Sequence, residues 1–152
     1  MSAFLELSAL RKVFPDGTVA VDGMDLSCVE GEFVVLLGPS GCGKTTTLRM
    51  VAGLEVPSSG SIRMAGEEIA QLPPQARDIG FVFQFYALYP HLSVFDNVAF
   101  PLRSVGCDVV QVRQRVGEMV ERLGLEHLVG RRPATLSGGD QQRVALARAL
   151  VR

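Results

Sequence analysis

The sequence predicts an α/β fold, in which strands buried in a parallel sheet alternate with helices. Residues 33–37 (FVVLL) are apolar without alternation, which is typical of a strand buried on both faces. A glycine-rich loop follows, and the apolar side chains after Lys44 then recur at helical spacing as far as Gly53. Residues 79–83 (IGFVF) are a second continuous apolar run, and helical segments follow it. Strands and helices in this order indicate an α/β protein.

Antiparallel strands are predicted in the N-terminal part. Apolar side chains, with a turn at Asp16-Gly17, predict three short strands at residues 4–13, 18–21 and 24–29. A small hairpin is predicted in residues 56–69, with its turn at Ser59-Gly60.

The C-terminal half is predicted to be mainly helical. Ser93 is a candidate N-cap for a short helix through Phe100, and Asp108 begins a longer helix. One face of that helix carries Val109, Val112, Val116, Met119, Val120 and Leu123. Pro133 marks a break, and Ser137 precedes a helix that continues to the end of the chain. We expect residues 1–78 to hold the antiparallel strands and the glycine-rich loop, and residues 79–152 to hold the second apolar strand and a helical lobe.

Length and composition exclude several classes of protein. The 152 residues suit one domain, and a 47% hydrophobic share excludes wholesale disorder. The net charge of −1 provides no field to attract nucleic acid. Three cysteines at unrelated spacings argue against a disulfide framework or a zinc site. No apolar stretch approaches the ~18 residues of a membrane-spanning helix, and no signal peptide is recognisable, so a cytosolic chain is expected.

The glycine-rich loop has the pattern of a phosphate-binding loop. Residues 38–45 (GPSGCGKT) fit G-x-x-x-x-G-K-[ST], in which backbone N–H groups and a helix N-terminus surround phosphate oxygens. Lys44 is expected to pair with the β- and γ-phosphates, and the hydroxyl of Thr45 to bind Mg²⁺. The predicted nucleotide-binding positions here are Gly38, Pro39, Ser40, Gly41, Cys42, Gly43, Lys44, Thr45 and Thr46.

A second glycine cluster lies in residues 136–143 (LSGGDQQR). A serine N-cap and two glycines would leave backbone N–H groups free for an anion. Taken alone, the cluster is more simply a capped helix start. Together with the phosphate loop, it favours a second anion-binding segment.

The two glycine motifs together resemble those of the ATP-binding subunits of ABC transporters. GPSGCGKTT, the strand that ends in Gln84 and LSGGDQQRVALARALVR carry this resemblance, which covers essentially the whole chain. PPQARDI and ALYPHLSVFDNVAFPL are similar to the importer group for sugars, glycerol phosphate, polyamines or ferric iron. The resemblance implies a P-loop NTPase core with an antiparallel β subdomain and a helical subdomain. It also implies ATP and Mg²⁺ as cofactors, and a subunit bound to the inner face of the cell membrane.

The resemblance also implies roles for individual residues. Phe14 would stack on adenine, although it could simply be an apolar residue at a strand end. Gln84 would contact Mg²⁺ or the attacking water and is counted with Lys44 as catalytic; the alternative is a polar strand terminus. Residues 85–90 would contact a transmembrane permease subunit, or be an ordinary loop. The positions that would bind ATP held by a second ATP-binding subunit, in a head-to-tail dimer, are Ser137, Gly138, Gly139 and Gln141.

Two departures from the family pattern affect these expectations. Asp140 stands where the importer group usually has glutamine, and a carboxylate near a γ-phosphate is unfavourable unless it points away or pairs with a neighbour. Beyond the position of Arg152, the family continues with a strand ending in Asp-Glu and with a switch histidine. The chain therefore resembles the N-terminal portion of a longer subunit whose core sheet lacks its C-terminal part. We expect an exposed apolar edge at residues 33–37 and no ATP hydrolysis by these residues alone.

Two other classes of function are compatible with the same motifs. One is a non-transport ABC ATPase that acts in DNA repair or translation. The importer-like residues 85–90 and the lack of a basic patch argue against this alternative. The other is a nucleotide-binding or interaction module that does not hydrolyse ATP. The sequence does not identify the transported solute.

Overall fold

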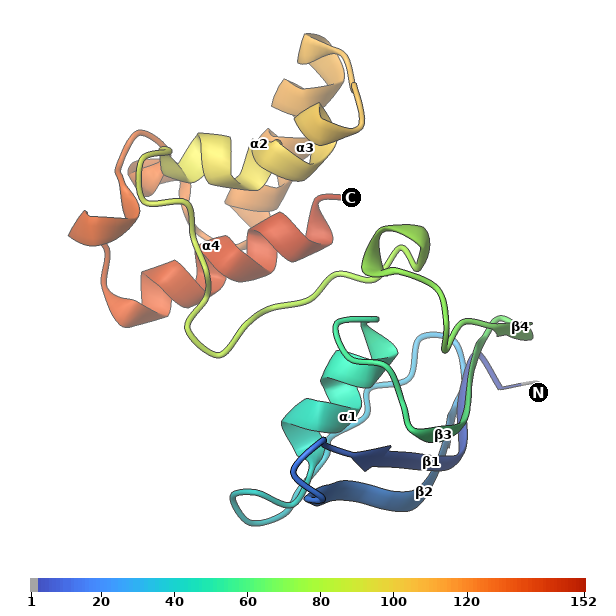
Figure 1. Ribbon diagram of the computed structural model, residues 1–152. Coiled ribbons are helices and arrows are strands. Elements are labelled where there is room, and N and C mark those ends of the chain that lie inside the picture. Colours follow the sequence, from blue (N-terminus) through green and yellow to red (C-terminus); the bar gives the residue numbers. More distant parts are fainter. Residues whose placement is uncertain (1–2) are drawn as a thin grey trace. The chain divides into compact units, whose positions relative to one another are not determined.

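The computed structural model describes residues 3–152, which divide into two compact units after Ile79. The first unit ends at Ile79 and contains a β-sheet and one helix, whereas the second unit, Gly80–Arg152, is helical (Figure 1). Each unit has an apolar core of its own. No described helix is long and apolar enough to cross a membrane.

The sheet of the first unit is antiparallel throughout. Its strand order is β2-β1-β3-β4, so β1 is paired on both sides. The strands are β1 (Leu5–Val13), β2 (Val19–Cys28), β3 (Ser59–Met64) and β4 (Glu67–Glu68). The 3-10 helix η1 (Pro74–Ala76) follows β4.

A bulge in β1 determines which of its side chains are buried. Leu7 and Leu10 are both buried, although residues three apart would face opposite sides of a regular strand. The pairing of β1 with β2 shifts register between these two leucines, and Ala9 between them has a left-handed φ of 47°. The N–H of Ala9 donates to Asp25 Oδ1 at 2.7 Å instead of to the ladder. The bulge therefore returns Leu10 to the core without leaving a donor unpaired.

Helix α1 (Lys44–Val51) contributes Met50 to the core of the first unit. The predicted helix after Lys44 is confirmed, and not all of its apolar side chains are buried. Thr47 and Met50 are buried, whereas Leu48 is 50% exposed. The core consists of Leu7, Leu10, Val21, Met50, Ile62, Ile69 and Ala70.

Three helices build the second unit, and each begins at a predicted N-cap. They are α2 (Val94–Ser104), α3 (Val109–Arg122) and α4 (Gly138–Leu150). The side chains of Ser93, Asp108 and Ser137 accept hydrogen bonds from backbone N–H groups of the first turn. The core includes Val94, Val98 and Leu102 of α2, Val112, Val116 and Val120 of α3, and Val144 and Ala147 of α4.

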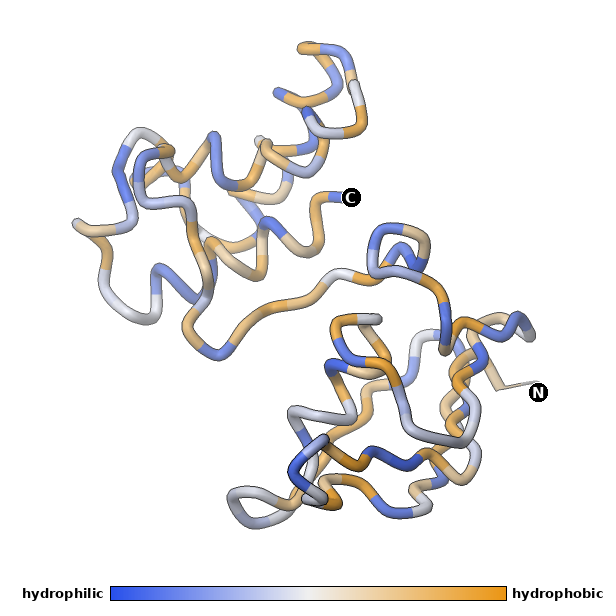
Figure 2. Tube along the Cα trace, viewed as in Figure 1, coloured by the Kyte–Doolittle hydropathy of each residue, from blue (hydrophilic) through white to orange (hydrophobic). Residues whose placement is uncertain are grey.

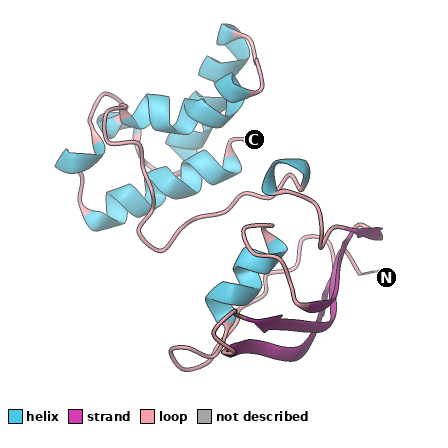
Figure 3. Ribbon diagram, viewed as in Figure 1, coloured by secondary structure: helices cyan, strands magenta, loops and turns pink. Residues whose placement is uncertain are grey.

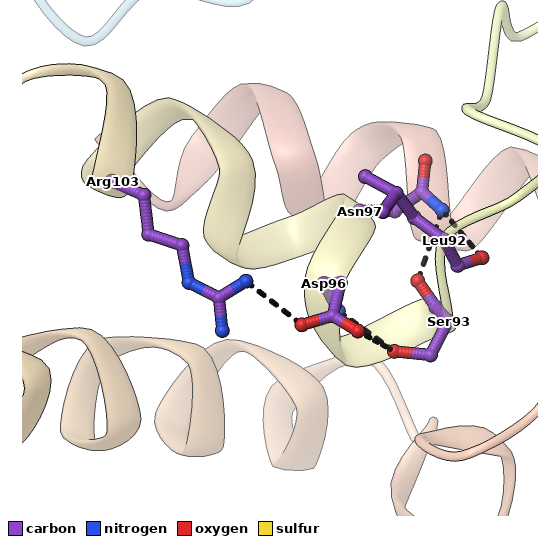
Figure 4. Close-up of polar contacts among 5 residues, drawn as sticks. All are labelled: Leu92, Ser93, Asp96, Asn97 and Arg103. Atoms are coloured by element: carbon purple, nitrogen blue, oxygen red, sulfur yellow. Dashed lines mark hydrogen bonds and ion pairs between the residues drawn. The ribbon is translucent and has the colours of Figure 1, made fainter.

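A polar cluster fixes the start of α2 (Figure 4). Ser93 Oγ accepts from the N–H of Asp96 at 3.0 Å and donates to Asp96 Oδ2 at 2.6 Å. The hydrogen bond from Ser93, with a second one from Arg103 at 2.8 Å, lowers the pKa of Asp96. Asn97 is fully buried and donates to the carbonyls of Leu92 and Ser93.

The two predicted parallel strands are not strands in the described structure. Residues 33–37 and 79–83 are loop (Figure 3), and Phe33 and Leu37 are 90% and 87% exposed. Figure 2 shows the loop that follows η1 as mostly hydrophobic. A parallel strand exists only when a neighbouring strand supplies its ladder of hydrogen bonds, and no described strand pairs with either segment. Prediction of strands from apolar runs alone was therefore wrong here.

Smaller predictions in the first unit also need correction. The strands predicted at residues 18–21 and 24–29 form one strand, β2, which runs from Val19 to Cys28. Its register opposite β1 shifts at residues 22–23, so the strand continues through them. The predicted hairpin exists, but its turn is at Ala65-Gly66, because Ser59 and Gly60 already belong to β3. A Cβ at Gly60 would lie 2.4 Å from the carbonyl oxygen of Ala9, so this glycine permits close strand approach rather than a turn.

In the second unit, helix α2 is longer than predicted. It continues past Phe100 to Ser104 with Pro101 inside it, because the apolar face continues through the buried Leu102. Helix α4 ends at Leu150 rather than at the last residue.

Arg77 joins the end of α1 to the segment before η1. Its side chain is almost fully buried, at 2% exposure, and donates to four carbonyl oxygens. Two of these belong to Met50 and Val51 in the last turn of α1, at 2.7 and 2.9 Å. The others belong to Ala70 and Leu72, both at 2.9 Å. The guanidinium therefore satisfies helix C-terminal carbonyls that have no donor within the helix.

Replacing Arg77 with alanine should lower the free energy of unfolding by about 3 kcal/mol, because buried carbonyl groups would lose their donors. Urea-induced unfolding of the full-length protein measures the change. Arg63→Ala is the matched control, since Arg63 is exposed and its ion pair with Glu68 is 3.7 Å long. That control should cost less than about 0.5 kcal/mol. Equal losses for the two variants would contradict the role given to Arg77.

Candidate functional site

The loop formed by residues 38–43 leads directly into α1 and packs against β2. Gly41 and Gly43 have left-handed φ values of 81° and 89°. A Cβ at Gly43 would lie 2.3 Å from the carbonyl oxygen of Ala20 and 3.0 Å from Val21 Cγ2. No other residue fits at position 43 without displacing β2, so the sheet fixes the end of the loop.

The side chain of Lys44 folds back over the loop. Its Nζ donates to the carbonyl oxygens of Gly38 and Pro39, both at 2.7 Å, and lies 3.4 Å from Cys42 Sγ. The only other lysine, Lys12, is engaged elsewhere, 2.7 Å from Glu55 Oε1. Lys44 therefore supplies the positive charge of this loop.

The start of α1 offers unpaired backbone donors beside that charge. The first N–H groups of a helix have no acceptor within the helix, and the N-cap residue Gly43 provides no side chain to accept from them. The first turn contains no acidic residue. Thr45 is exposed, and Thr46 lies half-buried next to it. Free N–H groups, a helix N-terminus and an ammonium group suit a phosphate, so these residues fit the predicted ligand.

Phe14 lies in the turn between β1 and β2. Its N–H donates to the carbonyl of Thr18 at 2.9 Å, and Lys12 Nζ lies 5.3 Å from the centre of its half-buried ring. The ring thus belongs to the same unit as the phosphate loop. Its stacking on a base stays a prediction.

Gln84 lies in the second unit. So do residues 85–90, which we call the 85–90 loop. Gln84 is exposed, and Phe85 is 87% exposed. Tyr86 and Ala87 have left-handed φ values of 62° and 47°, which non-glycine residues rarely adopt. The loop therefore has an unusual, defined backbone and presents an aromatic ring to solvent.

Two residues that the sequence analysis did not single out hold this loop. Arg148 of α4 donates to the carbonyl oxygens of Ala87 and Tyr86, at 2.8 and 2.9 Å. Asn97 of α2 accepts from the N–H of Tyr89 at 2.8 Å and donates to the carbonyl of the same residue at 3.1 Å. The signal in the sequence was a polar side chain within each apolar run, VALARALV and VFDNVAF.

The second glycine cluster forms the first turn of α4. Ser137 Oγ accepts from the N–H of Asp140 at 3.2 Å and donates to Asp140 Oδ2 at 2.6 Å. That hydrogen bond, with Arg143 beside the carboxylate, lowers the pKa of Asp140. Asp140 thus pairs with a neighbour, as its position near a predicted phosphate site requires.

The other predicted residues of this turn differ in accessibility. Open space surrounds the Cβ position of both Gly138 and Gly139, and both residues are exposed. Gln141 is half-buried, and its Nε2 donates to the carbonyls of Pro133 and Leu136 at 3.2 and 3.3 Å. The two glycines therefore have accessible backbone, whereas the amide of Gln141 already has partners within the chain.

The predicted residues thus form separate groups. Phe14 and the phosphate loop belong to the first unit, whereas Gln84 and the turn at Ser137 belong to the second. Within residues 3–152, no group of three or more His, Cys, Asp or Glu side chains could hold a metal ion. The three cysteines, Cys28, Cys42 and Cys107, are free.

Relatives of known name are ATP-binding proteins of import systems. The chain is 50% identical over 150 residues to the trehalose import ATP-binding protein SugC of Mycobacterium tuberculosis, covering 99% of this chain and 38% of the relative. It is 54% identical to the trehalose/maltose import ATP-binding protein MalK of Thermococcus litoralis, covering 99% and 42%. The chain spans about two fifths of the length of these curated relatives.

Solved structures with the same fold are ABC ATPase domains. One is the dimeric ATP-binding cassette MJ0796 in a post-hydrolysis state with ADP and phosphate, with a TM-score of 0.88 and 34% identity over 97% of this chain and 69% of that chain. Another is CbiO1 of Clostridium perfringens, part of an ABC transporter complex, with a TM-score of 0.87 and 31% identity over 99% and 62%. The predicted fold class is confirmed. The model of the ABC transporter family matches residues 21–152, and the chain belongs to that family.

Proposed function

We propose that this chain is part of the ATP-binding subunit of an importer, which couples ATP binding and hydrolysis to solute movement through a membrane permease. One observation carries the proposal. A phosphate loop with its lysine folded over it occurs in a chain that is about half identical, along nearly its whole length, to import ATP-binding proteins. Under this proposal the subunit acts at the inner face of the cell membrane.

The phosphates of ATP would bind at the start of α1. The ammonium of Lys44 would give up its two hydrogen bonds to loop carbonyls and pair with the β- and γ-phosphates instead. The N–H groups of the first turn would donate to phosphate oxygens. Bound Mg²⁺ would neutralise phosphate charge, with Thr45 as a ligand and Gln84 in contact with the ion or the attacking water. Phe14 would contact the adenine.

A second copy of the subunit would complete each nucleotide site. Gly138 and Gly139 are exposed, so their N–H groups and the Ser137 hydroxyl are the candidates to contact the γ-phosphate bound by the other copy. The related cassette MJ0796 was solved as a dimer with ADP and phosphate, which supports this arrangement.

The 85–90 loop is the candidate contact with the permease. An aromatic ring that is 87% exposed, on a loop held by the buried Asn97 and the half-buried Arg148, is suited to insertion between the residues of a partner. Burial of Phe85 in a complex would also remove the unfavourable exposure of this ring to water.

The described residues do not select the solute. Identity is nearly the same, 48–54%, to ATP-binding proteins named for trehalose, glycerol 3-phosphate and spermidine/putrescine import. Similarity to this chain thus does not follow the solute for which the relatives are named. We therefore assign solute choice to other subunits of the system.

Lys44→Ala should weaken ATP binding by the full-length protein at least about tenfold, which corresponds to about 1.4 kcal/mol. The substitution removes the cation of the loop, while the glycines that define its backbone are retained. Isothermal titration with Mg-ATP measures the affinity, and Arg63→Ala on β3 is the control with the same loss of charge. An affinity that changes less than about twofold in Lys44→Ala would refute the phosphate-loop assignment.

Mg-ATP should protect Cys42 from alkylation. Cys42 is exposed and lies beside the ammonium of Lys44, so bound phosphates would cover it. Mass spectrometry after iodoacetamide treatment gives the rate at each thiol. Cys28 and Cys107 are half-buried internal controls, whose rates should not respond to nucleotide. Equal rates at Cys42 with and without Mg-ATP would contradict phosphate binding at this loop.

Phe85→Ala should abolish binding to vesicles that carry the permease of its own transport system, without changing the affinity for ATP. The reason is that the ring is solvent-exposed in the free protein and contributes nothing to its core. Flotation with permease vesicles, and with vesicles of the same lipids alone, measures binding. Val110→Ala on α3 is the control, because Val110 is similarly exposed at 74%. Equal binding of both variants would remove the 85–90 loop from the interface.

A further inference from the structure

The 85–90 loop has an unfavourable backbone conformation at two of its residues. Tyr86 and Ala87 have left-handed φ values of 62° and 47°, and neither is a residue type that favours this region. The N–H of Tyr86 donates to the carbonyl of Phe83 at 2.9 Å. This local hydrogen bond still leaves the carbonyls of Tyr86 and Ala87 to be paired. Such strained conformations persist only where the surroundings impose them.

Arg148 supplies hydrogen-bond donors to the two carbonyls of the loop. Two nitrogens of its guanidinium donate to the consecutive carbonyls of Ala87 and Tyr86, at 2.8 and 2.9 Å. Its carbon Cζ lies 5.4 Å from the ring centre of Tyr89. Adjacent carbonyls match the planar fork of an arginine, whereas a lysine ammonium presents a single nitrogen. The contact therefore depends on the geometry of the guanidinium and not only on its charge.

The other end of the loop is fixed independently. The buried amide of Asn97 pairs with both the N–H and the carbonyl of Tyr89, and the ring of Tyr89 lies 4.5 Å from that of Phe100, centre to centre. The loop is thus held at residues 86–87 by α4 and at residue 89 by α2. Phe85 lies just outside these two attachments and is 87% exposed.

Arg148 also connects the loop to the helix that starts at Ser137. It belongs to the last turns of α4, which packs against the rest of the second unit through Val144 and Ala147. Rigid secondary-structure elements are among the features that carry coupling between distant sites. Helix α4 joins the 85–90 loop, through Arg148, to the turn that contains Gly139.

We propose that Arg148 is a positioning residue, which holds the 85–90 loop in the shape that contacts the permease and couples the position of this loop to helix α4. The inference rests on the proposed function, because it needs the permease as the partner of the loop. The inference adds to the proposed function the residue that links the permease-contacting loop to helix α4.

Hydrogen exchange of the full-length protein tests the positioning. In Arg148→Ala and in Arg148→Lys, the amides of Tyr86 and Ala87 should exchange at least about tenfold faster, because the loop would open more often. Arg115→Ala is the control, since Arg115 is exposed on α3 and its loss should leave these amides unchanged. Methylguanidinium should restore protection in Arg148→Ala but not in Arg148→Lys, where the lysine side chain blocks the site. Unchanged exchange in both Arg148 variants would overturn the inference.

Permease-stimulated phosphate release tests the coupling. With vesicles that carry the permease, Arg148→Ala should lose at least about tenfold in stimulated kcat, while the KM for ATP and the release without permease stay unchanged. Methylguanidinium should recover part of the stimulated rate. If the permease stimulates phosphate release equally in Arg148→Ala and in the unsubstituted protein, the inference about Arg148 is overturned but the proposed function is not. An unsubstituted protein that the permease does not stimulate would instead overturn the proposed function.

Discussion

Pairing of backbone carbonyls outside regular secondary structure is the constraint on which this structure depends. A backbone carbonyl without a donor is costly when it is buried, and four segments here are held by a polar side chain that donates to their carbonyls. Lys44 donates to two carbonyls of the phosphate loop, Arg77 to four carbonyls around the end of α1, and Arg148 to two in the 85–90 loop. Asn97 does the same at the start of α2. These cross-links hold segments that no helix or strand could fix.

Two of these side chains also have a role in the function that we propose. Under that proposal Lys44 would exchange its carbonyl partners for phosphate oxygens, because both are negatively polarised acceptors and phosphate is the stronger one. Arg148 has no such exchange partner, so its bonds serve to give the 85–90 loop one shape. Arg77 is buried and structural. A cation bonded to carbonyls can thus be a ligand-binding group or a clamp. Lys44 and Arg148 are both half-buried, and what distinguishes Lys44 is its position at the start of α1.

Apolar runs were the weakest guide to secondary structure in this chain. Residues 33–37 and 79–83 have the composition of buried parallel strands but are loops here. Such a composition suits a strand in a sheet that is covered on both faces. It does not give the backbone an intrinsic preference for the strand conformation. Without a paired neighbour, the ladder hydrogen bonds that define a strand cannot form. The fold class is nevertheless confirmed by the solved structures of related cassettes, and the resemblance carried by the two glycine motifs predicts it without these two strands.

Local features could be predicted from the sequence: the three serine or aspartate caps, the helix that begins at Lys44, and the glycine-rich loop before it. Each of these depends on interactions between residues only a few positions apart, so a short stretch of sequence contains all the partners. Three other features could not be predicted in this way: the bulge at Ala9, the burial of Arg77 and the hydrogen bonds from Arg148 to the 85–90 loop. Arg148 lies 61 and 62 residues from the carbonyls it pairs with. Contacts over that separation arise from packing, and no local pattern specifies them.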